Sequence, residues 1–215
     1  AFQVYFIEPL TQGWSLQEIA VKAAPLVLIA TGLAFCFRAN VWNIGAEGQF
    51  IVGGAIGGWI GLLTHGGAGQ GVLGSWWILP AMLIAGALAG AAYAMIPALL
   101  RVRLGVSEIL TSLMLVYVAE LWLDYMVRGP WKDPKGFNFP VTVTFDPPAT
   151  LPLLVEGGRL HAGVLLALIA VVVATVVFAK SLFGFEVRLV GAAPRAARFA
   201  GFSETRLTVA VLAIS

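Results

Sequence analysis

The amino-acid sequence predicts an all-α protein, a polytopic bundle of transmembrane helices, from three observations. Of its 215 residues, 60% are hydrophobic and 11% are charged, and the mean hydropathy is +0.91. Soluble domains carry about 25% charged residues, so this chain has too few charges to cover a globule in water. Its apolar residues form long runs between short polar connections, and helices satisfy their own backbone hydrogen bonds in lipid. We therefore expect a single membrane domain over residues 1–215, with about five spans and part of a sixth.

Five apolar runs are candidates for these spans. They cover residues 18–37, 49–63, 76–100, 106–127 and 161–179, and a sixth begins near residue 206. A span needs about 20 residues, so the second run fits a re-entrant helix as well as a full crossing. The sixth run is shorter still, and the first residue is alanine rather than methionine. We expect the domain to be incomplete at both ends.

The positions of Lys and Arg predict the orientation of the connections. Cytoplasmic connections are enriched in these residues, which places Arg101 and Arg103 in the cytoplasm together with the basic segment 180–206. Residues 64–75 contain no Lys or Arg and are placed outside, as is the loop 128–160. Within that loop, alternating residues 141–145 predict a short strand. The formal net charge of +2 is too small to indicate a nucleic-acid partner.

Glycines in the second and third runs have the spacing of a helix-packing motif. Gly53, Gly54, Gly57, Gly58 and Gly61 form overlapping pairs four residues apart, and Gly86 and Gly90 have the same spacing in the next run. Small residues at this spacing let helix backbones approach closely in lipid. We expect tight helix packing here, in preference to a pore lined by bare backbone.

A polar stretch between the first two runs is the main candidate site. Asn43, Gly45, Glu47, Gly48 and Gln49 lie where the chain leaves one run and enters the next. Polar groups at this depth are costly unless they are paired or line a water-filled path, and Gly permits an unwound backbone. We expect the stretch to cap and join two helices, with Glu47 holding backbone N–H groups, in preference to contacting a solute. A Glu47→Gln change separates the two roles: lost stability indicates capping, and a folded but inactive protein indicates a path.

Three carboxylates fall within the run 106–127. Glu108 lies near its cytoplasmic end, and Glu120 and Asp124 lie four residues apart toward its outer end. Two acids at this spacing repel each other when both are ionised, so they need a partner, a proton or water. A proton or cation relay is one interpretation. The favoured interpretation places Glu120 and Asp124 at the level of the lipid headgroups, paired with Arg128 or Lys132; Asp124 and Arg128 have the helical i,i+4 spacing.

The basic segment 180–206 contains a second candidate site. Pro194 suits the first position of a short helix, and Gly201 suits the residue after its end. Arg195 and Arg198 would share one face of that helix. A two-turn helix is too short to be stable alone and needs a surface, either anionic lipid or a soluble protein.

Enzyme and metal-site motifs are absent from the sequence. It contains no CxxC, HExxH, GxSxG or GxxxxGK[ST], so we predict no metal site, no hydrolase centre and no ATP hydrolysis by this chain. The one cysteine, Cys36, is expected to be a small core residue. His65 and His161 are expected to lie on the surface. The chain is interpreted as a transport component rather than an enzyme, with no cofactor of its own.

Four stretches of the chain, in order, resemble the membrane permeases of ABC importers. They are NIGAEGQ at residues 43–49, VSEILTSLML at 106–115, VRGPWKDP at 127–134, and GFEVRLVG at 184–191 followed by PRAARFAG at 194–201. The similarity is to the branched-chain amino acid and simple-sugar permease superfamily. Within it, the chain looks most like the nucleoside and simple-sugar permeases that work with basic-membrane-lipoprotein-type binding proteins.

The resemblance implies an importer of nucleosides or related simple sugars, with alternating access driven by a separate ATPase that holds ATP and magnesium. It implies two permease subunits, identical or different, a solute-binding lipoprotein outside, and the inner membrane of a bacterium with its lipids. It also implies that the segment 180–206 docks into the ATPase through a coupling helix. The coupling residues would be Gly191, Pro194, Arg195, Ala196, Ala197, Arg198 and Gly201.

Three rival functions remain open from the sequence. An ion-coupled carrier would use Glu120 and Asp124 and need no ATPase. An ABC permease for another small polar solute would share the architecture and differ in specificity. A non-transporting membrane scaffold would move no solute at all. A coupling helix argues against the first and the last, because neither needs one.

Overall fold

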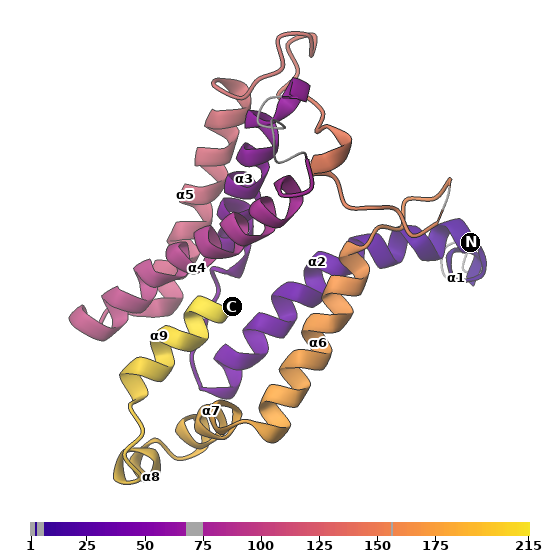
Figure 1. Ribbon diagram of the computed structural model, residues 1–215. Helices are drawn as coiled ribbons and strands as arrows, with labels where there is room; N and C mark the ends of the chain where they lie inside the picture. Colours follow the sequence, from indigo (N-terminus) through magenta and orange to yellow (C-terminus); the bar gives the residue numbers. More distant parts are fainter. Residues whose placement is uncertain (1–2, 4–6, 68–74, 156) are drawn as a thin grey trace. The chain divides into compact units, whose positions relative to one another are not determined.

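The computed structural model describes residues 3, 7–67, 75–155 and 157–215, and the all-α prediction is confirmed in this part of the chain (Figure 1). In place of the strand expected at residues 141–145, the described structure has irregular backbone there and one isolated bridge elsewhere, between Leu153 and His161. The helices are α1 (Glu8–Thr11), α2 (Gly13–Arg38), α3 (Ala46–Leu63), α4 (Ile78–Leu104), α5 (Glu108–Arg128), α6 (Gly163–Lys180), α7 (Leu182–Ala192), α8 (Pro194–Phe199) and α9 (Glu204–Ile214), with 3₁₀ turns η2 (His65–Gly67) and η3 (Pro147–Ala149).

The chain divides into two compact units, each described here by itself. The first comprises residues 1–31 and 151–185, which hold α1, most of α2 and α6. An ion pair between Glu18 and Arg159, at 3.1 Å, ties the segment before α6 to α2 within this unit. The second comprises residues 32–150 and 186–215, which hold the end of α2, helices α3 to α5, most of α7, and helices α8 and α9.

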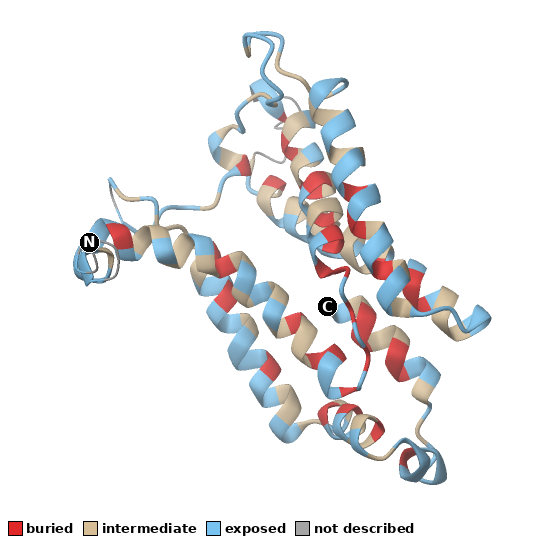
Figure 2. Ribbon diagram, turned by 180° about the vertical axis from the view of Figure 1, so that it is seen from behind, coloured by how far each residue is buried: buried red, intermediate tan, exposed pale blue. Residues whose placement is uncertain are grey.

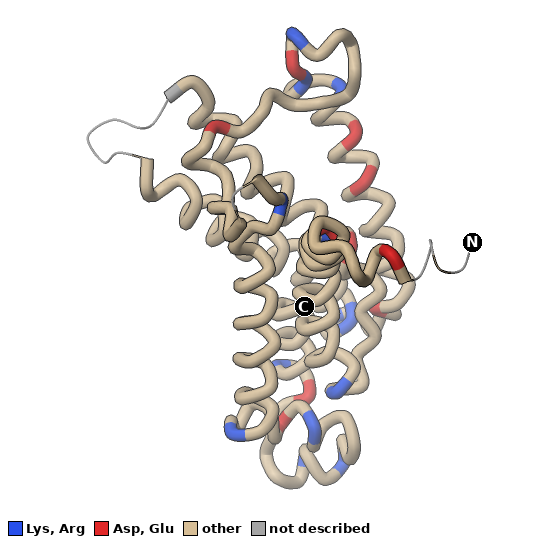
Figure 3. Tube along the Cα trace, turned by 90° about the vertical axis from the view of Figure 1, so that its right-hand side faces the viewer, with Lys and Arg blue, Asp and Glu red and all other residues tan. Residues whose placement is uncertain are grey.

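Four described helices are long and apolar enough to cross a membrane: α2, α4, α5 and α6. Four of the five expected spans are therefore found. Helix α3 has the same 18-residue length as α6, but its first turns carry Glu47 and Gln49. In the most apolar 18-residue window of each of the four spans, at most 22% of the residues are buried within the chain. Most residues of these helices are therefore half-buried or exposed (Figure 2). Charged residues leave long uncharged stretches along the helices (Figure 3).

Helices α3 and α4 pack through their glycines, as the spacing predicted. A Cβ atom added at Gly53 would lie 2.8 Å from the carbonyl oxygen of Gly86, and one at Gly86 would lie 2.9 Å from the carbonyl oxygen of Gly53. The next pair repeats the arrangement, since a Cβ at Gly57 would lie 2.8 Å from the carbonyl oxygen of Met82. The two backbones are thus in direct contact, which supplies van der Waals attraction where lipid gives no hydrophobic drive.

The irregular backbone of the loop 128–160 has a physical cause. Around residues 141–145 the loop folds back on itself instead of pairing with a second strand: the Asp133 N–H donates to the Val141 carbonyl at 2.8 Å, and η3 follows at once. The loop then returns to the end of α3. The Asp146 carboxylate accepts from the Gly66 N–H at 2.8 Å and lies 3.2 Å from His65 Nδ1. The connections expected on the outer side therefore meet at one end of the second unit.

Candidate functional site

The polar stretch 39–45 is a break between two helices, as expected. Helix α2 ends at Arg38, Asn40 adopts the left-handed conformation with φ of 57°, and α3 begins at Ala46. The Asn43 side chain is 2% exposed, and its Oδ1 accepts from the Gly45 N–H at 2.9 Å. This bond satisfies a backbone donor just before α3 that would otherwise be unpaired in the interior.

Asn43 and Gln49, which are buried, and Ser215, which is half-buried, form a polar group termed here the amide cluster. Asn43 Nδ2 donates to Ser215 Oγ at 2.6 Å, and Ser215 Oγ lies 3.4 Å from Gln49 Oε1. Ser215 Oγ also donates to the Leu212 carbonyl at 2.9 Å, which fixes the hydroxyl at the end of α9. Asn43 and Gln49 from the predicted site are thus brought together by a residue more than 160 positions away.

Helix α5 covers the other side of the break. Ser112, 1% exposed, accepts through its Oγ from the Ile44 N–H at 3.2 Å. A Cβ at Gly45 would lie 2.7 Å from the Cβ of Ser112, and one at Gly48 would lie 3.1 Å from the Cα of Val116. The two glycines of the motif therefore permit close contact between α3 and α5. Their described role is packing.

Glu47 takes a different position from the one predicted. It is exposed in the first turn of α3, and it forms no side-chain hydrogen bond with another described residue. The backbone N–H groups at the start of α3 are instead bound by other side chains: Gly45 donates to Asn43 and Ile44 donates to Ser112. A carboxylate in the first turn still interacts favourably with the helix dipole. Contact between Glu47 and a solute stays a prediction.

Glu108 is a structural anchor at the start of α5. Its carboxylate forms an ion pair with Arg101 near the end of α4, and the two side chains are 13% and 27% exposed. The same Oε1 atom lies 3.5 Å from the Trp42 N–H, in the helix break. Glu108 thus links the α4–α5 connection to the segment entering α3. The charge of Glu108 is therefore paired with Arg101 within the chain.

Glu120 and Asp124 both lie on the exposed face of α5. Arg128 Nε is 2.7 Å from both carboxylate oxygens of Asp124, so the favoured i,i+4 pairing is confirmed. The arrangement accounts for the Asp124 charge without a proton or cation relay.

We therefore expect Asp124→Asn and Glu120→Gln variants, singly and together, to retain more than about half of wild-type transport, because an exposed ion pair contributes only about 0–1 kcal/mol. Uptake of labelled solute into proteoliposomes measures this. Loss of uptake in the folded double variant would restore the relay interpretation.

The second candidate site folds as the short helix that was predicted. Pro194 opens α8, and Ala193 before it supplies no side-chain cap. Ala197 is 1% exposed and anchors the helix to the chain, whereas Arg195 and Ala196 are exposed. Phe199 is 94% exposed. Arg195 forms no ion pair with another described residue. The exposed Phe199 ring and this cation on one short helix give α8 the composition of a contact surface.

The residues flanking α8 fix its ends. Gly201 follows the helix with φ of 84°, a conformation that favours glycine and agrees with the prediction. Arg198 forms an ion pair with Glu204 at 2.7 Å, which joins α8 to the first turn of α9. Gly191, near the end of α7, lies against the carbonyl of Arg38 so closely that a Cβ would overlap it. The coupling segment is thus connected to the helix break at its start.

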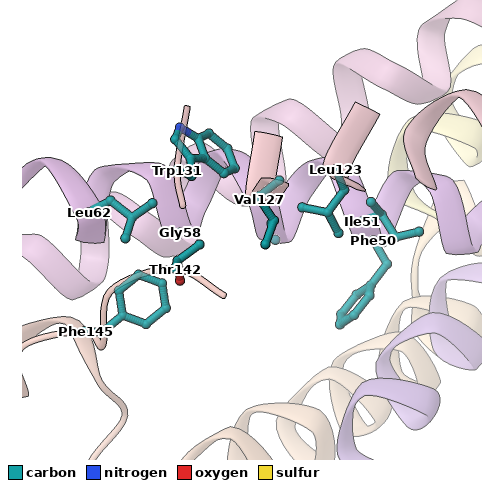
Figure 4. A pocket seen from close by; sticks show the side chains of 11 residues that line it. Phe50, Ile51, Gly58, Leu62, Leu123, Val127, Trp131, Thr142 and Phe145 are labelled. Carbon is teal, nitrogen blue, oxygen red and sulfur yellow. The ribbon is translucent and has the colours of Figure 1, made fainter. Parts of the chain in front are cut away.

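An apolar cavity of about 290 Å³ lies between α3, α5 and the loop 128–160 (Figure 4). Phe50, Leu123, Val127, Trp131 and Phe145 are among its lining side chains, and Thr142 supplies a hydroxyl. Hydroxylated solutes need several hydrogen-bonding partners, and these walls offer few. The cavity is therefore a poor candidate for the solute site.

Comparison with known proteins identifies the family. The profile of the family described as "Branched-chain amino acid transport system / permease component" matches residues 15–215. The chain belongs to this permease family. Together with four helices able to span a bilayer, this makes it a multi-pass membrane protein. The family is one of transport components, so the interpretation as a permease rather than an enzyme is confirmed.

Individual relatives of this permease are named for sugars and nucleosides. It is 41% identical over 213 residues to a glucose ABC transporter permease protein of Haloferax volcanii, covering 94% of this chain and 54% of the relative. It is 32% identical over 215 residues to a guanosine ABC transporter permease protein of Bacillus subtilis, covering 99% and 57%. A nucleoside ABC transporter permease protein of Lactococcus lactis is 27% identical over 225 residues, covering 100% and 59%.

These matches confirm the resemblance to the branched-chain amino acid and simple-sugar permeases. The permease chain spans between 54% and 59% of the length of these relatives. No solved structure matches it.

Several residues of the site were not found by sequence reasoning. Ser112, Ser215 and Glu204 are ordinary small or polar residues whose partners lie far away or around a turn. Ser112 falls within the second resembling stretch, which was the one available signal. His65 was expected to be an isolated surface residue, but it lies beside Asp146 because the loop folds back.

Proposed function

We propose that this permease is part of the membrane subunit of an ABC importer for nucleosides or related simple sugars. Solute would cross by alternating access, driven by ATP hydrolysis in a separate subunit. The observation that carries the proposal is the family match over residues 15–215, joined by relatives named as glucose, guanosine and nucleoside ABC permeases.

The class of solute follows from what the named solutes share. Glucose and the nucleosides are small molecules built on a hydroxylated sugar ring and carry no net charge. A path for them needs hydrogen-bonding groups rather than fixed charges. The second unit supports this, because Asp124 and Glu108 are paired with arginines and the buried polar side chains at the helix break, Asn43, Gln49 and Ser112, are amides and a hydroxyl.

The partners of the permease follow from the same proposal. An ATPase would dock on the cytoplasmic side at α8, where Arg195 and Phe199 are exposed. A second permease subunit, identical or different, would complete the path, and an extracytoplasmic solute-binding lipoprotein would deliver the solute to the loop 128–160. A bacterial inner membrane is the proposed location. ATP and magnesium would be held by the ATPase.

Purification of the full-length protein with its neighbouring gene products tests the docking surface. We expect an ATPase to co-purify with the wild type, and Arg195→Glu to lower its recovery by about tenfold, the effect of losing an interface arginine worth about 1.4 kcal/mol. Arg195 suits this test because it forms no ion pair with another described residue. Arg198 suits it less, since Arg198→Glu would also break the pair with Glu204.

The matched control is Arg206→Glu, which makes the same charge change at another exposed position, on α9. It should leave ATPase recovery within about twofold of the wild type, because a rim charge contributes little. Equal losses in both variants would mean that net charge, not the α8 surface, governs association. A wild-type preparation without an ATPase would contradict the proposed function. Stimulation of the associated ATPase by glucose or guanosine, added with the binding protein, would then identify the solute.

A further inference from the structure

Helix α9 connects the two candidate sites of the second unit. It begins at Glu204, beside α8, and ends at Ile214, next to the amide cluster. Eleven residues of α-helix are about 16 Å long. The short basic helix and the helix break therefore contact the same regular element at two separate points, although more than 140 residues separate them in sequence.

The contacts at the first end of α9 hold it to α8. The Arg198 guanidinium donates to the Glu204 carboxylate at 2.7 Å, and the Phe202 N–H donates to the Ala197 carbonyl at 3.0 Å. Ser203 caps α9 by accepting from the Arg206 N–H at 3.3 Å. The ion pair joins the two helices directly, and the Phe202–Ala197 bond orders the turn between them.

Along its length, α9 is packed through one buried face. Leu207, Thr208, Val211 and Leu212 form one buried stripe, and the helix packs against α4. The Val211 carbonyl also accepts from the thiol of Cys36 at 3.2 Å, near the end of α2. Because close-packed interiors do not deform continuously, we expect α9, packed along its buried stripe, to move as a rigid body.

The contacts at the far end join α9 to the helix break. Ser215 Oγ accepts from Asn43 Nδ2 at 2.6 Å, and Asn43 Oδ1 in turn accepts from the Gly45 N–H at 2.9 Å. The side-chain nitrogen of Asn43 therefore bonds to Ser215 after α9, and its side-chain oxygen bonds to the backbone that leads into α3. A displacement of Ser215 would be transmitted to Gly45 through the side chain of Asn43.

We propose that α9 transmits movement of α8 to the helix break, with Asn43 and Ser215 as the positioning residues that carry it across. This inference rests on the proposed docking of an ATPase at α8. It adds a route within the permease: ATPase contact, α8, the Arg198–Glu204 pair, α9, Ser215, Asn43, and the start of α3. Chains of packed and hydrogen-bonded groups are one physical means by which two distant sites are coupled.

The test compares two hydroxyl deletions, one at Thr208 within α9 and one at Ser215, which directly follows it, in the full-length protein reconstituted with its ATPase. Ser215→Ala removes the hydroxyl that crosses to Asn43. Thr208→Val removes a hydroxyl from a buried residue whose bond, to the Glu204 carbonyl at 2.9 Å, stays within α9. The readout is the number of solute molecules transported per ATP hydrolysed, measured at equal recovery of the ATPase.

We expect Ser215→Ala to lower this ratio about fivefold, the factor that one neutral hydrogen bond contributes to an equilibrium, and Thr208→Val to leave it unchanged. Asn43→Ala should lower it as much, and the double variant should lose no more than either single variant, because both remove one shared link. If Asn43→Ala fails to assemble, Asn43→Ser keeps a polar atom but is too short to reach Ser215, and serves the same readout.

A Ser215→Ala ratio equal to that of the wild type, with the ATPase bound, would overturn the inference and leave the proposed function standing. Additive losses in the double variant would also overturn it, since independent effects do not share a link. Absence of an ATPase from the wild-type preparation would instead overturn the proposed function, and the inference with it. A merely structural role predicts lower thermal stability in Ser215→Ala and Thr208→Val alike, with the ratio unchanged in both.

Discussion

A Gly53→Ala variant is expected to unfold at a lower temperature than the wild type, with a loss of about 2 kcal/mol in the free energy of unfolding. The added methyl carbon would lie 2.8 Å from the Gly86 carbonyl oxygen, whereas carbon–oxygen contacts are normally about 3.3–3.6 Å. Because the opposing atom belongs to a helix backbone, the clash is relieved only if α3 and α4 separate. That separation weakens every backbone contact along their glycine seam.

Gly54→Ala is the matched control, one residue along the same helix. A Cβ atom at Gly54 would meet nothing within 4 Å. Replacing glycine by alanine inside a helix is worth about 1 kcal/mol in helix propensity, so this variant should be as stable as the wild type or more so. Thermal unfolding in one detergent, followed by tryptophan fluorescence, measures both. Equal shifts in the two variants would show that the α3–α4 contact is looser than described.

The second large effect is expected at Glu108. A Glu108→Ala variant removes the partner of Arg101 and the acceptor near the Trp42 N–H. Removing one member of a fully buried ion pair costs about 3–5 kcal/mol. The Arg101 side chain is 27% exposed and therefore partly hydrated, so we expect about 2 kcal/mol. Transport should also fall, because the segment entering α3 loses its anchor on α5.

Glu120→Ala provides the comparison, since it removes a carboxylate from the same helix at an exposed position. It should leave the unfolding temperature nearly unchanged. Glu108→Gln should fall between the two alanine variants, because an amide oxygen still accepts a hydrogen bond while the charge is lost. Thermal unfolding and solute uptake, measured on the same preparations, check the order. A Glu108→Ala variant as stable as Glu120→Ala would rule out the anchor.

Patterns that act over a few residues were predicted correctly from the sequence. The i,i+4 spacing of Asp124 and Arg128 predicted their ion pair, and the positions of Pro194 and Gly201 predicted both ends of α8. The strand expected at residues 141–145 was wrong because alternation alone supplies no partner strand, and the loop bonds to itself instead. Glu47 was expected to bind backbone N–H groups, but the spacing could not reveal that Asn43 occupies that position.

What the sequence determined by itself was the membrane environment, the existence of the long helices, both ends of α8, and the small-residue faces of α3 and α4. These follow from composition and from short-range periodicity, which act along the chain. Only the tertiary structure decided which polar groups meet: Ser112 with the break before α3, Glu108 with Arg101 and Trp42, and Ser215 with Asn43 and Gln49. A buried hydrogen bond depends on which surfaces the folded helices bring within about 3 Å of each other, and no local pattern encodes that distance.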